Sequence, residues 1–151
     1  MTQNSYLNKY YIVFLEHKMK YKDLNKPKKG YAGYLLPDVE RDRLFSEFPP
    51  KYSKTVAHHV TTKFGATENE TPDDVESYSV VGYADTGDGL EALVISIGGT
   101  VNRPDGSIYH ITWSINPEKY KPKDSNDLVK RDYDEVGPIN IDMVPTFFPF
   151  N

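Results

Sequence analysis

The sequence predicts an α+β domain made mostly of antiparallel strands, with one or two helices. Short runs rich in β-branched and aromatic residues alternate with turn signals along most of the chain. The tetrapeptide TGDG at 86–89 separates two such runs and supplies glycines for a tight hairpin. One run, which a double proline follows, has the apolar spacing of a helix instead. The length of 151 residues fits a single domain over 1–151.

The first part of the chain is expected to form two strands and the clearest helix. Residues 9–17, KYYIVFLEH, have the composition of a central strand, and a loop separates them from a second strand at 30–36. The helix is expected from about Val39 to Phe48, with Asp38 as its N-cap. The double proline that follows ends it, since proline cannot continue a helix.

The remainder of the chain is expected to be strands with one short helix. The hairpin signal lies between runs that end in VVGYAD and begin with LEALVI, and RPDG at 103–106 is a further turn. Pro145 places the last strand at an edge or a bulge, because proline has no N–H to donate to a neighbouring strand. The expected elements are strands at 57–64, 76–85, 90–99, 109–115 and 139–148, and a helix at 124–131.

Composition excludes several classes of protein. With 38% hydrophobic and 26% charged residues, the chain has the balance of a soluble globular protein. It contains no cysteine, which rules out disulfides, thiolate nucleophiles and cysteine-bound zinc. The N-terminus lacks the pattern of a signal peptide, and no apolar run approaches the ~20 residues of a membrane helix. We therefore expect a cytoplasmic protein without membrane contact (in the host cytoplasm, if a phage encodes it).

Charge is unevenly distributed along the chain. The net charge is −4, yet residues 1–30 hold seven lysines against two acidic residues. Such a basic run is usually a solvated loop, although it could also meet a polyanion. The acidic balance of the whole disfavours a surface for duplex DNA. A small anionic ligand or an RNA end remains compatible with this distribution.

Two of the expected strands carry the same tripeptide pattern. His59-Val60-Thr61 and His110-Ile111-Thr112 each place a histidine and a threonine two positions apart. Side chains of a strand alternate between faces, so each histidine shares a face with its threonine. The connection between the motifs contains a hairpin, which allows the two strands to lie close together in one sheet. Two imidazoles and two hydroxyls would then line one groove.

This set of groups suits the cleavage of a phosphodiester bond. One neutral imidazole can remove a proton from the attacking oxygen while the other, protonated, gives a proton to the departing oxygen. Histidine fits both roles because its ordinary pKa of about 6.5 lies near neutrality. The two hydroxyls can hold the non-bridging phosphate oxygens. The reaction needs no metal and no cofactor, and we expect neither.

The paired motifs resemble those of the 2H phosphoesterase superfamily, which carries two H-x-[ST] motifs on facing strands. The resemblance covers the layout of about residues 9–116, and its specific part is the two tripeptides. It implies a bilobal α+β fold in which two strand-rich halves flank a central cleft. It also implies that His59 and His110 are the catalytic pair and that Thr61 and Thr112 hold the phosphate.

Other side chains of the predicted strands could also contact a ligand. Lys63 shares the parity of His59 and could reach a phosphate at the rim, and Ser114 shares the parity of His110. Tyr11, on the first expected strand, could stack on a base. Pleat alternation turns His58 away from His59, toward the opposite face. A metal site formed by His58 and His59 is disfavoured, since adjacent strand residues do not readily bind one ion.

Three functions are consistent with these observations. The favoured one is a metal-independent phosphodiesterase acting on a cyclic di- or oligonucleotide immune signal, as phage nucleases of anti-defence systems do. The second is an RNA-processing enzyme for 2′,3′-cyclic phosphate ends or 2′-5′ linkages, with the basic segment along the RNA. The third is a non-catalytic nucleotide-binding sponge, in which the two histidines do not reach one phosphate. The sponge would still have the groove, so a panel of activity assays is needed to separate the first two from the third.

Overall fold

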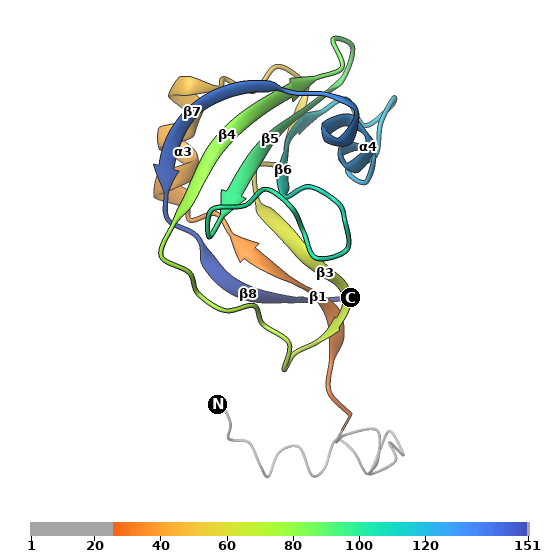
Figure 1. The fold of residues 1–151 in the computed structure, drawn as a ribbon. Helices are drawn as coiled ribbons and strands as arrows, with labels where there is room; N and C mark the ends of the chain where they lie inside the picture. Colours follow the sequence, from red (N-terminus) through yellow and green to blue (C-terminus); the bar gives the residue numbers. More distant parts are fainter. Residues whose placement is uncertain (1–25, 151) are drawn as a thin grey trace.

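The computed structural model describes residues 26–150, so the expected strand at 9–17 lies outside the described residues. The fold is α+β, with a curled antiparallel sheet and two helices in the described part of the chain (Figure 1). The elements in chain order are β1 (Lys29–Leu35), α3 (Asp38–Glu47), β2 (Lys54–Thr55), β3 (His59–Thr67), β4 (Tyr78–Asp85), β5 (Leu90–Ile97), β6 (His110–Ile115), α4 (Asp124–Arg131), β7 (Asp134–Ile141) and β8 (Val144–Pro149).

All the strands belong to one sheet. Seven of them follow the order β7-β4-β5-β6-β3-β1-β8, and the two-residue strand β2 pairs with β6. Every neighbouring pair is antiparallel. The strands β7 and β8 stand at opposite ends of this order, yet only residues 142 and 143 separate them in the chain. The sheet must therefore curl until its two edges approach each other, as Figure 1 shows.

The sheet consists of two halves that meet along a short seam. One half contains β8, β1 and β3, and the other contains β6, β5, β4 and β7. The registered pairing between β3 and β6 is limited to Val60 and Ile111, and both side chains are fully buried. These are the middle residues of the two predicted tripeptide motifs. The seam between the halves is thus formed by the two motifs themselves.

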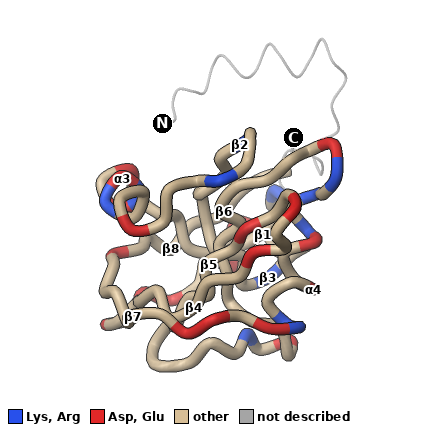
Figure 2. Tube along the Cα trace, turned by 90° about the horizontal axis from the view of Figure 1, so that it is seen from above, with Lys and Arg blue, Asp and Glu red and all other residues tan. Residues whose placement is uncertain are grey.

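The two helices cover opposite faces of the sheet (Figures 1 and 2). On one face, Leu44 and Phe45 of α3 pack with Trp113, whose ring meets that of Phe45 edge-on at a centroid distance of 5.4 Å. On the other face, Leu128 and Val129 of α4 belong to a second apolar cluster with residues of β5 and β6. Burial of these clusters removes apolar surface from water and provides the main driving force for folding. Val60 and Ile111 of the motif seam belong to the first cluster.

Irregular pairing interrupts the strands around the seam. On β3, Gly33 of β1 pairs with Thr61 while the preceding Ala32 pairs with Lys63, so Thr62 is an extra residue. On β6, Glu91 pairs with Ser114 and Ala92 with Thr112, so residue 113 is extra. Such β-bulges reverse the alternation of side chains beyond them.

Most of the expected elements are present with small shifts in their limits. Asp38 is the first helical residue and not the N-cap, which is Pro37, and it pairs with Arg41 one turn later. The expected final strand at 139–148 is two strands, because the chain leaves one edge of the sheet after residue 141 and enters the other at residue 144. Pro145 lies on β8, an edge strand as expected, and pairs only with β1.

Close approach of β1 and β3 requires glycine at position 33. A Cβ atom added to Gly33 would lie 2.0 Å from the carbonyl oxygen of Val60, well inside any real contact. We expect Gly33→Ala to lower the free energy of unfolding by about 3 kcal/mol or more, because it forces apart the strands beside the seam. Gly87→Ala is the matched control: its φ is +86° but it has open space, so about 1 kcal/mol is expected. Urea unfolding measures both, and equal losses would contradict the close approach.

Candidate functional site

The four motif side chains line one groove on the face of the sheet that α4 covers. Its volume is about 470 Å³, and the side chains of His59, Thr61, His110 and Thr112 all contribute to its wall. The rest of the lining comes from β1, β3, the segment before β3, the loop after β5 and the region that begins α4, with residues Tyr31, Val56, Phe64, Arg103, Pro122, Lys123 and Asn126.

Antiparallel pairing sets the arrangement of the four motif residues. With Val60 opposite Ile111, the residues on either side of each turn to the opposite face from these two buried residues. Continuing this register past Val60 places Thr61 beside His110. On the other side of the pair a bulge interrupts the register, and the carbonyl oxygen of Thr112 accepts from the N–H of Ala57 at 3.0 Å. The side chains of His59 and Thr112 nevertheless line the same groove as those of Thr61 and His110.

A large bulge contains His58 and His59. Thr55 pairs with Ser114 of β6 and Val60 with Ile111, so this strand spends two more residues than β6 over the same span. At Ala57 the backbone has a φ of +42°, a left-handed conformation that costs a residue with a side chain about 1 kcal/mol or more. The surplus residues allow both His58 and His59 to project near the groove.

The ring of His59 is held among aromatic side chains. Its centroid lies 5.2 Å from that of Tyr31 and 4.9 Å from that of Phe148. Burial lowers the pKa of His59 to about 4, and the nearby imidazoles of His58 and His110 contribute by opposing a second positive charge. His59 is therefore neutral near pH 7 and able to accept a proton.

His110 presents a defined face to the groove. Its Nδ1 lies 2.8 Å from the carbonyl oxygen of Ile108, which can only accept, so Nδ1 carries a proton. Nε2 is then the nitrogen of His110 that can interact with a ligand in the groove. Burial lowers the pKa of His110 from 6.5, the hydrogen bond to Ile108 raises it, and the charge of Arg103 lowers it.

The hydroxyl of Thr112 is oriented by the helix that covers the groove. Its Oγ1 lies 2.8 Å from Oγ of Ser125, a fully buried residue of α4. When Ser125 donates in this contact, the proton of Thr112 remains available to an acceptor in the groove. The competing acceptor, the carbonyl oxygen of Pro122, is 3.4 Å away, a long and weak contact.

Arg103 adds a positive charge to the wall of the groove. Its Nη1 donates to the carbonyl oxygen of Thr61 at 3.2 Å, and Nε and Nη2 donate to Asp105. These bonds use three of the five N–H groups of the guanidinium, so two remain for a ligand. A guanidinium with spare donors in a groove suits the binding of phosphate oxygens.

Aromatic rings form a patch at one end of the groove. Tyr31 stacks on Phe148 with centroids 4.9 Å apart, and Phe64 contacts Phe150 at 5.2 Å. Phe64 is 75% exposed and Phe150 is 46% exposed, which is unusual for such large apolar side chains. Exposed aromatic rings beside a polar groove are typical of surfaces on which a nucleobase stacks.

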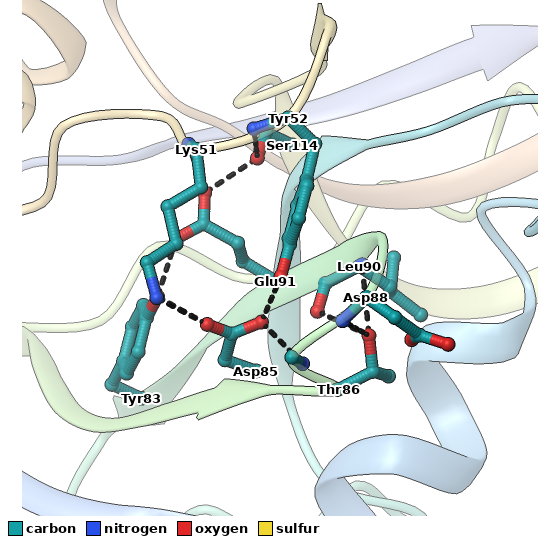
Figure 3. Close-up of polar contacts among 10 residues, drawn as sticks. Lys51, Tyr52, Tyr83, Asp85, Thr86, Asp88, Leu90, Glu91 and Ser114 are labelled. Atoms are coloured by element: carbon teal, nitrogen blue, oxygen red, sulfur yellow. Dashed lines mark hydrogen bonds and ion pairs between the residues drawn. The ribbon is translucent and has the colours of Figure 1, made fainter.

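A buried hydrogen-bond network anchors residues 51 and 52, which begin the segment that leads to the bulge at His58 and His59 (Figure 3). Glu91 is only 1% exposed and accepts hydrogen bonds from the hydroxyls of Tyr83 and Ser114 and, at 2.9 Å, from the backbone N–H of Lys51. Lys51 also pairs with Asp85 at 2.6 Å. These bonds tie the segment before β2 to β4, β5 and β6. They therefore fix the position of the backbone at Lys51, where the segment leading to His59 begins.

Bulges explain why the predicted positions of Lys63 and Ser114 differ from those in the structure. Lys63 does not line the groove but is exposed and paired with Glu70, because the extra residue at Thr62 reverses the alternation and brings Phe64 to the groove instead. Ser114 is fully buried and bonded to Glu91 for the same reason on β6.

The expectation that His58 turns away from its neighbour is also wrong. The Nδ1 atoms of His58 and His59 are 3.0 Å apart. Strict alternation fails here because both residues belong to the bulge that follows Ala57. Tyr11, the remaining residue predicted to bind substrate, lies outside the described residues.

Several lining residues could not be identified from the sequence. Tyr31 is brought to the groove by the pairing of β1 with β3, and Lys123 and Asn126 by the position of α4. Arg103 carried a weak signal, since it stands in a turn that leads directly into the second motif strand.

The described residues show neither a metal-binding cluster nor a membrane-spanning helix. Within residues 26–150, no three or more His, Asp or Glu side chains gather as they would to hold a metal ion. None of the helices in this range has the length and apolar character needed to cross a membrane.

Comparisons with known proteins give no family. No protein-family model, curated protein or solved structure matches the chain. The groove itself is therefore the evidence that bears on function.

The low pKa of His59 can be measured directly by NMR. We expect His59 to titrate with a midpoint near pH 4, because burial and the adjacent imidazoles disfavour its charged form. Two-dimensional NMR of the imidazole nitrogens, recorded from pH 3.5 to 8 without ligand, follows this titration, and assignment uses the His59→Gln variant. A midpoint near 6.5 would contradict the buried, like-charged surroundings described above.

Proposed function

We propose that this protein is a metal-independent phosphodiesterase that cleaves a small nucleotide by acid–base catalysis between His59 and His110. The observation that carries the proposal is the convergence of both histidines and both motif threonines on one groove of about 470 Å³. The charge of His110 also contributes to the low pKa of His59, in agreement with the position of both rings in this groove.

The surroundings of the two rings suggest which is the base and which is the acid. His59, with a pKa of about 4, is neutral near pH 7 and takes the proton of the attacking oxygen. As the new P–O bond forms, the bond to the leaving oxygen breaks and His110 gives that oxygen a proton from Nε2. A bound phosphate anion raises the pKa of His110 and so favours the protonated form that this role needs. If the attacking oxygen is a ribose 2′-hydroxyl, the product is a cyclic phosphate; if it is water, a phosphomonoester.

Charge on the phosphate would be held by donors from both halves of the sheet. The side chains of Thr61 and Thr112 line the groove together with the two histidines, where their hydroxyls could donate to the non-bridging phosphate oxygens. Arg103 and Lys123 add positive charge to the same groove. Donors that are fixed before the reaction stabilise the developing charge without reorganisation.

A nucleotide is the phosphodiester that best fits the remaining wall. Tyr31 and Phe64 line the groove, and Phe148 and Phe150 extend the aromatic surface beside it. Such rings accept the faces of bases. Resemblance to the 2H phosphoesterases agrees with this chemistry, and the two halves of the sheet on either side of the motif seam would correspond to the two lobes of that fold.

Within this class we favour a cyclic di- or oligonucleotide. The groove is compact, and the charged residues of the described chain are scattered without a continuous basic face for a long polyanion (Figure 2). An RNA end would bring its backbone to the lysine-rich segment, most of which lies outside the described residues. A nucleotide-binding sponge would use the same groove without cleavage, and only an assay separates it from an enzyme.

An activity panel in EDTA tests the proposal. The substrates are 3′,5′-cyclic dinucleotides, cyclic trinucleotides, 2′-5′ oligoadenylate and RNA with a 2′,3′-cyclic end, analysed by chromatography. We expect cleavage of at least one, reduced by 10³-fold or more, on the order of the loss of a catalytic acid or base, in His59→Ala and His110→Ala with binding retained. Lys130→Ala, exposed on α4, is the control. Recovery of intact, tightly bound nucleotide from the wild type would indicate the sponge instead.

The hydroxyl of Thr112 gives a second test. Thr112→Val keeps the shape of the side chain but removes the donor, so kcat should fall by about 10²-fold, as for loss of one transition-state donor. Thr112→Ser should retain most of the activity. Ser125→Ala should produce a smaller loss of about 3- to 10-fold, since Thr112 keeps its hydroxyl but loses the group that orients it. Equal activity of Thr112→Val and Thr112→Ser would show that the hydroxyl does not act on the phosphate.

A further inference from the structure

His58 contacts His59 and so places a third imidazole next to the two that line the groove. Their Nδ1 atoms are 3.0 Å apart, and the rings meet edge-on with centroids 5.2 Å apart and an interplanar angle of 81°. Phe148 packs against both rings, at 5.7 Å from His58 and 4.9 Å from His59. The backbone of His58 is fixed as well, since its carbonyl oxygen accepts from the N–H of Leu36 at 2.9 Å.

A hydrogen bond between two imidazole nitrogens needs a proton on one and a lone pair on the other. If Nδ1 of His59 donates, neutral His59 keeps a lone pair on Nε2. If Nδ1 of His59 accepts, its proton must sit on Nε2, and that atom cannot take a proton from an attacking oxygen. His58 is exposed and does not line the groove, so the contact leaves Nε2 as the nitrogen of His59 that is free for the groove. The partner at Nδ1 thus decides whether His59 can be a base.

The groove favours the first arrangement. Its polar lining is rich in donors, namely the hydroxyls of Thr61 and Thr112, the guanidinium of Arg103 and the ammonium of Lys123, beside the amide of Asn126, which can donate or accept. Positive charges and N–H or O–H donors stabilise a lone pair on Nε2 and oppose a proton there.

Both catalytic rings would then be oriented in the same way. The Ile108 carbonyl accepts from Nδ1 of His110, and His58 would accept from Nδ1 of His59. We propose that His58 is a positioning residue, which accepts the Nδ1 proton of His59 and thereby holds Nε2 of His59 as the proton acceptor toward the substrate. The catalytic consequence rests on the proposed function, whereas the tautomer is a property of the free protein.

Two variants of His58 test whether its hydrogen-bond acceptor, and not merely its bulk, acts on His59. His58→Asn retains an acceptor, Oδ1, at nearly the position of Nδ1, and His58→Leu has a branched side chain without one. Because His58 is exposed, both should fold, and thermal melting confirms this before other measurements. Nitrogen-15 NMR at pH 7.5, on the full chain without ligand, reports the tautomer of His59.

We expect the wild type and His58→Asn to carry the proton of His59 on Nδ1, and His58→Leu to shift it toward Nε2. On the nucleotide that the panel identifies, His58→Leu should lower kcat at least about tenfold with KM unchanged, well short of the ~10⁴-fold that a wholly wrong tautomer costs a histidine-based protease. His58→Asn should stay within about threefold of the wild type.

The two readouts distinguish the possible failures. A proton on Nε2 of His59 in the wild type, or one tautomer shared by all three proteins, would overturn the positioning role whatever the activity. The expected tautomers in a protein that cleaves none of the nucleotides would uphold the role of His58 and refute the proposed phosphodiesterase.

Discussion

The backbone pairing of Val60 with Ile111 is the constraint on which the candidate site depends. It is the one registered pair between β3 and β6, and it joins the two halves of the sheet. Both side chains are buried, so their neighbours in the motifs must turn toward the groove. A slip of this pairing by one residue would send the imidazoles and hydroxyls to the opposite face. The groove thus exists because a short seam is held in a single register.

The surroundings of the seam hold that register from several directions. Gly33 allows β1 to approach the carbonyl of Val60, and the Glu91 network ties down the chain before β2. The left-handed Ala57 and the bulge after it deliver two histidines where a regular strand would deliver one. Local strain of this kind persists only where the rest of the structure over-determines it.

Burial has opposite consequences for the two kinds of group in the groove. It favours neutral imidazole at His59, which suits a base, and it makes a single guanidinium and the motif hydroxyls more effective toward an anion, because electrostatic interactions are stronger where the local dielectric constant is lower than that of water. The aromatic rings that desolvate His59 also form the surface on which a base could lie. One set of side chains would therefore tune the acid–base pair and bind the nucleotide.

The sequence predicted the parts of the fold that depend on local pattern. The hairpin at residues 86–89 follows from turn chemistry, and the sharing of one groove by His59, Thr61, His110 and Thr112 follows from period-two alternation. The structure has both, and it also has the helix expected at 124–131. The fold class is likewise α+β with an antiparallel sheet.

The predictions failed where that alternation breaks or where distant segments meet. Bulges at Thr62 and residue 113 displaced Lys63 and Ser114 from the groove, and the bulge after Ala57 brought His58 toward it. No single-sequence pattern marks a bulge reliably, because the extra residue is set by pairing with another strand. The contributions of Arg103 and Tyr31 to the wall depend on topology in the same way.

A crystal structure with a non-cleavable cyclic dinucleotide would test the central claim most directly. The account predicts that one phosphorus lies between His59 and His110, with Nε2 of each ring within hydrogen-bond reach of an oxygen on that phosphorus. It also predicts non-bridging oxygens on the hydroxyls of Thr61 and Thr112. A ligand whose phosphates contact only one of the two imidazoles, or that binds outside the groove, would contradict it.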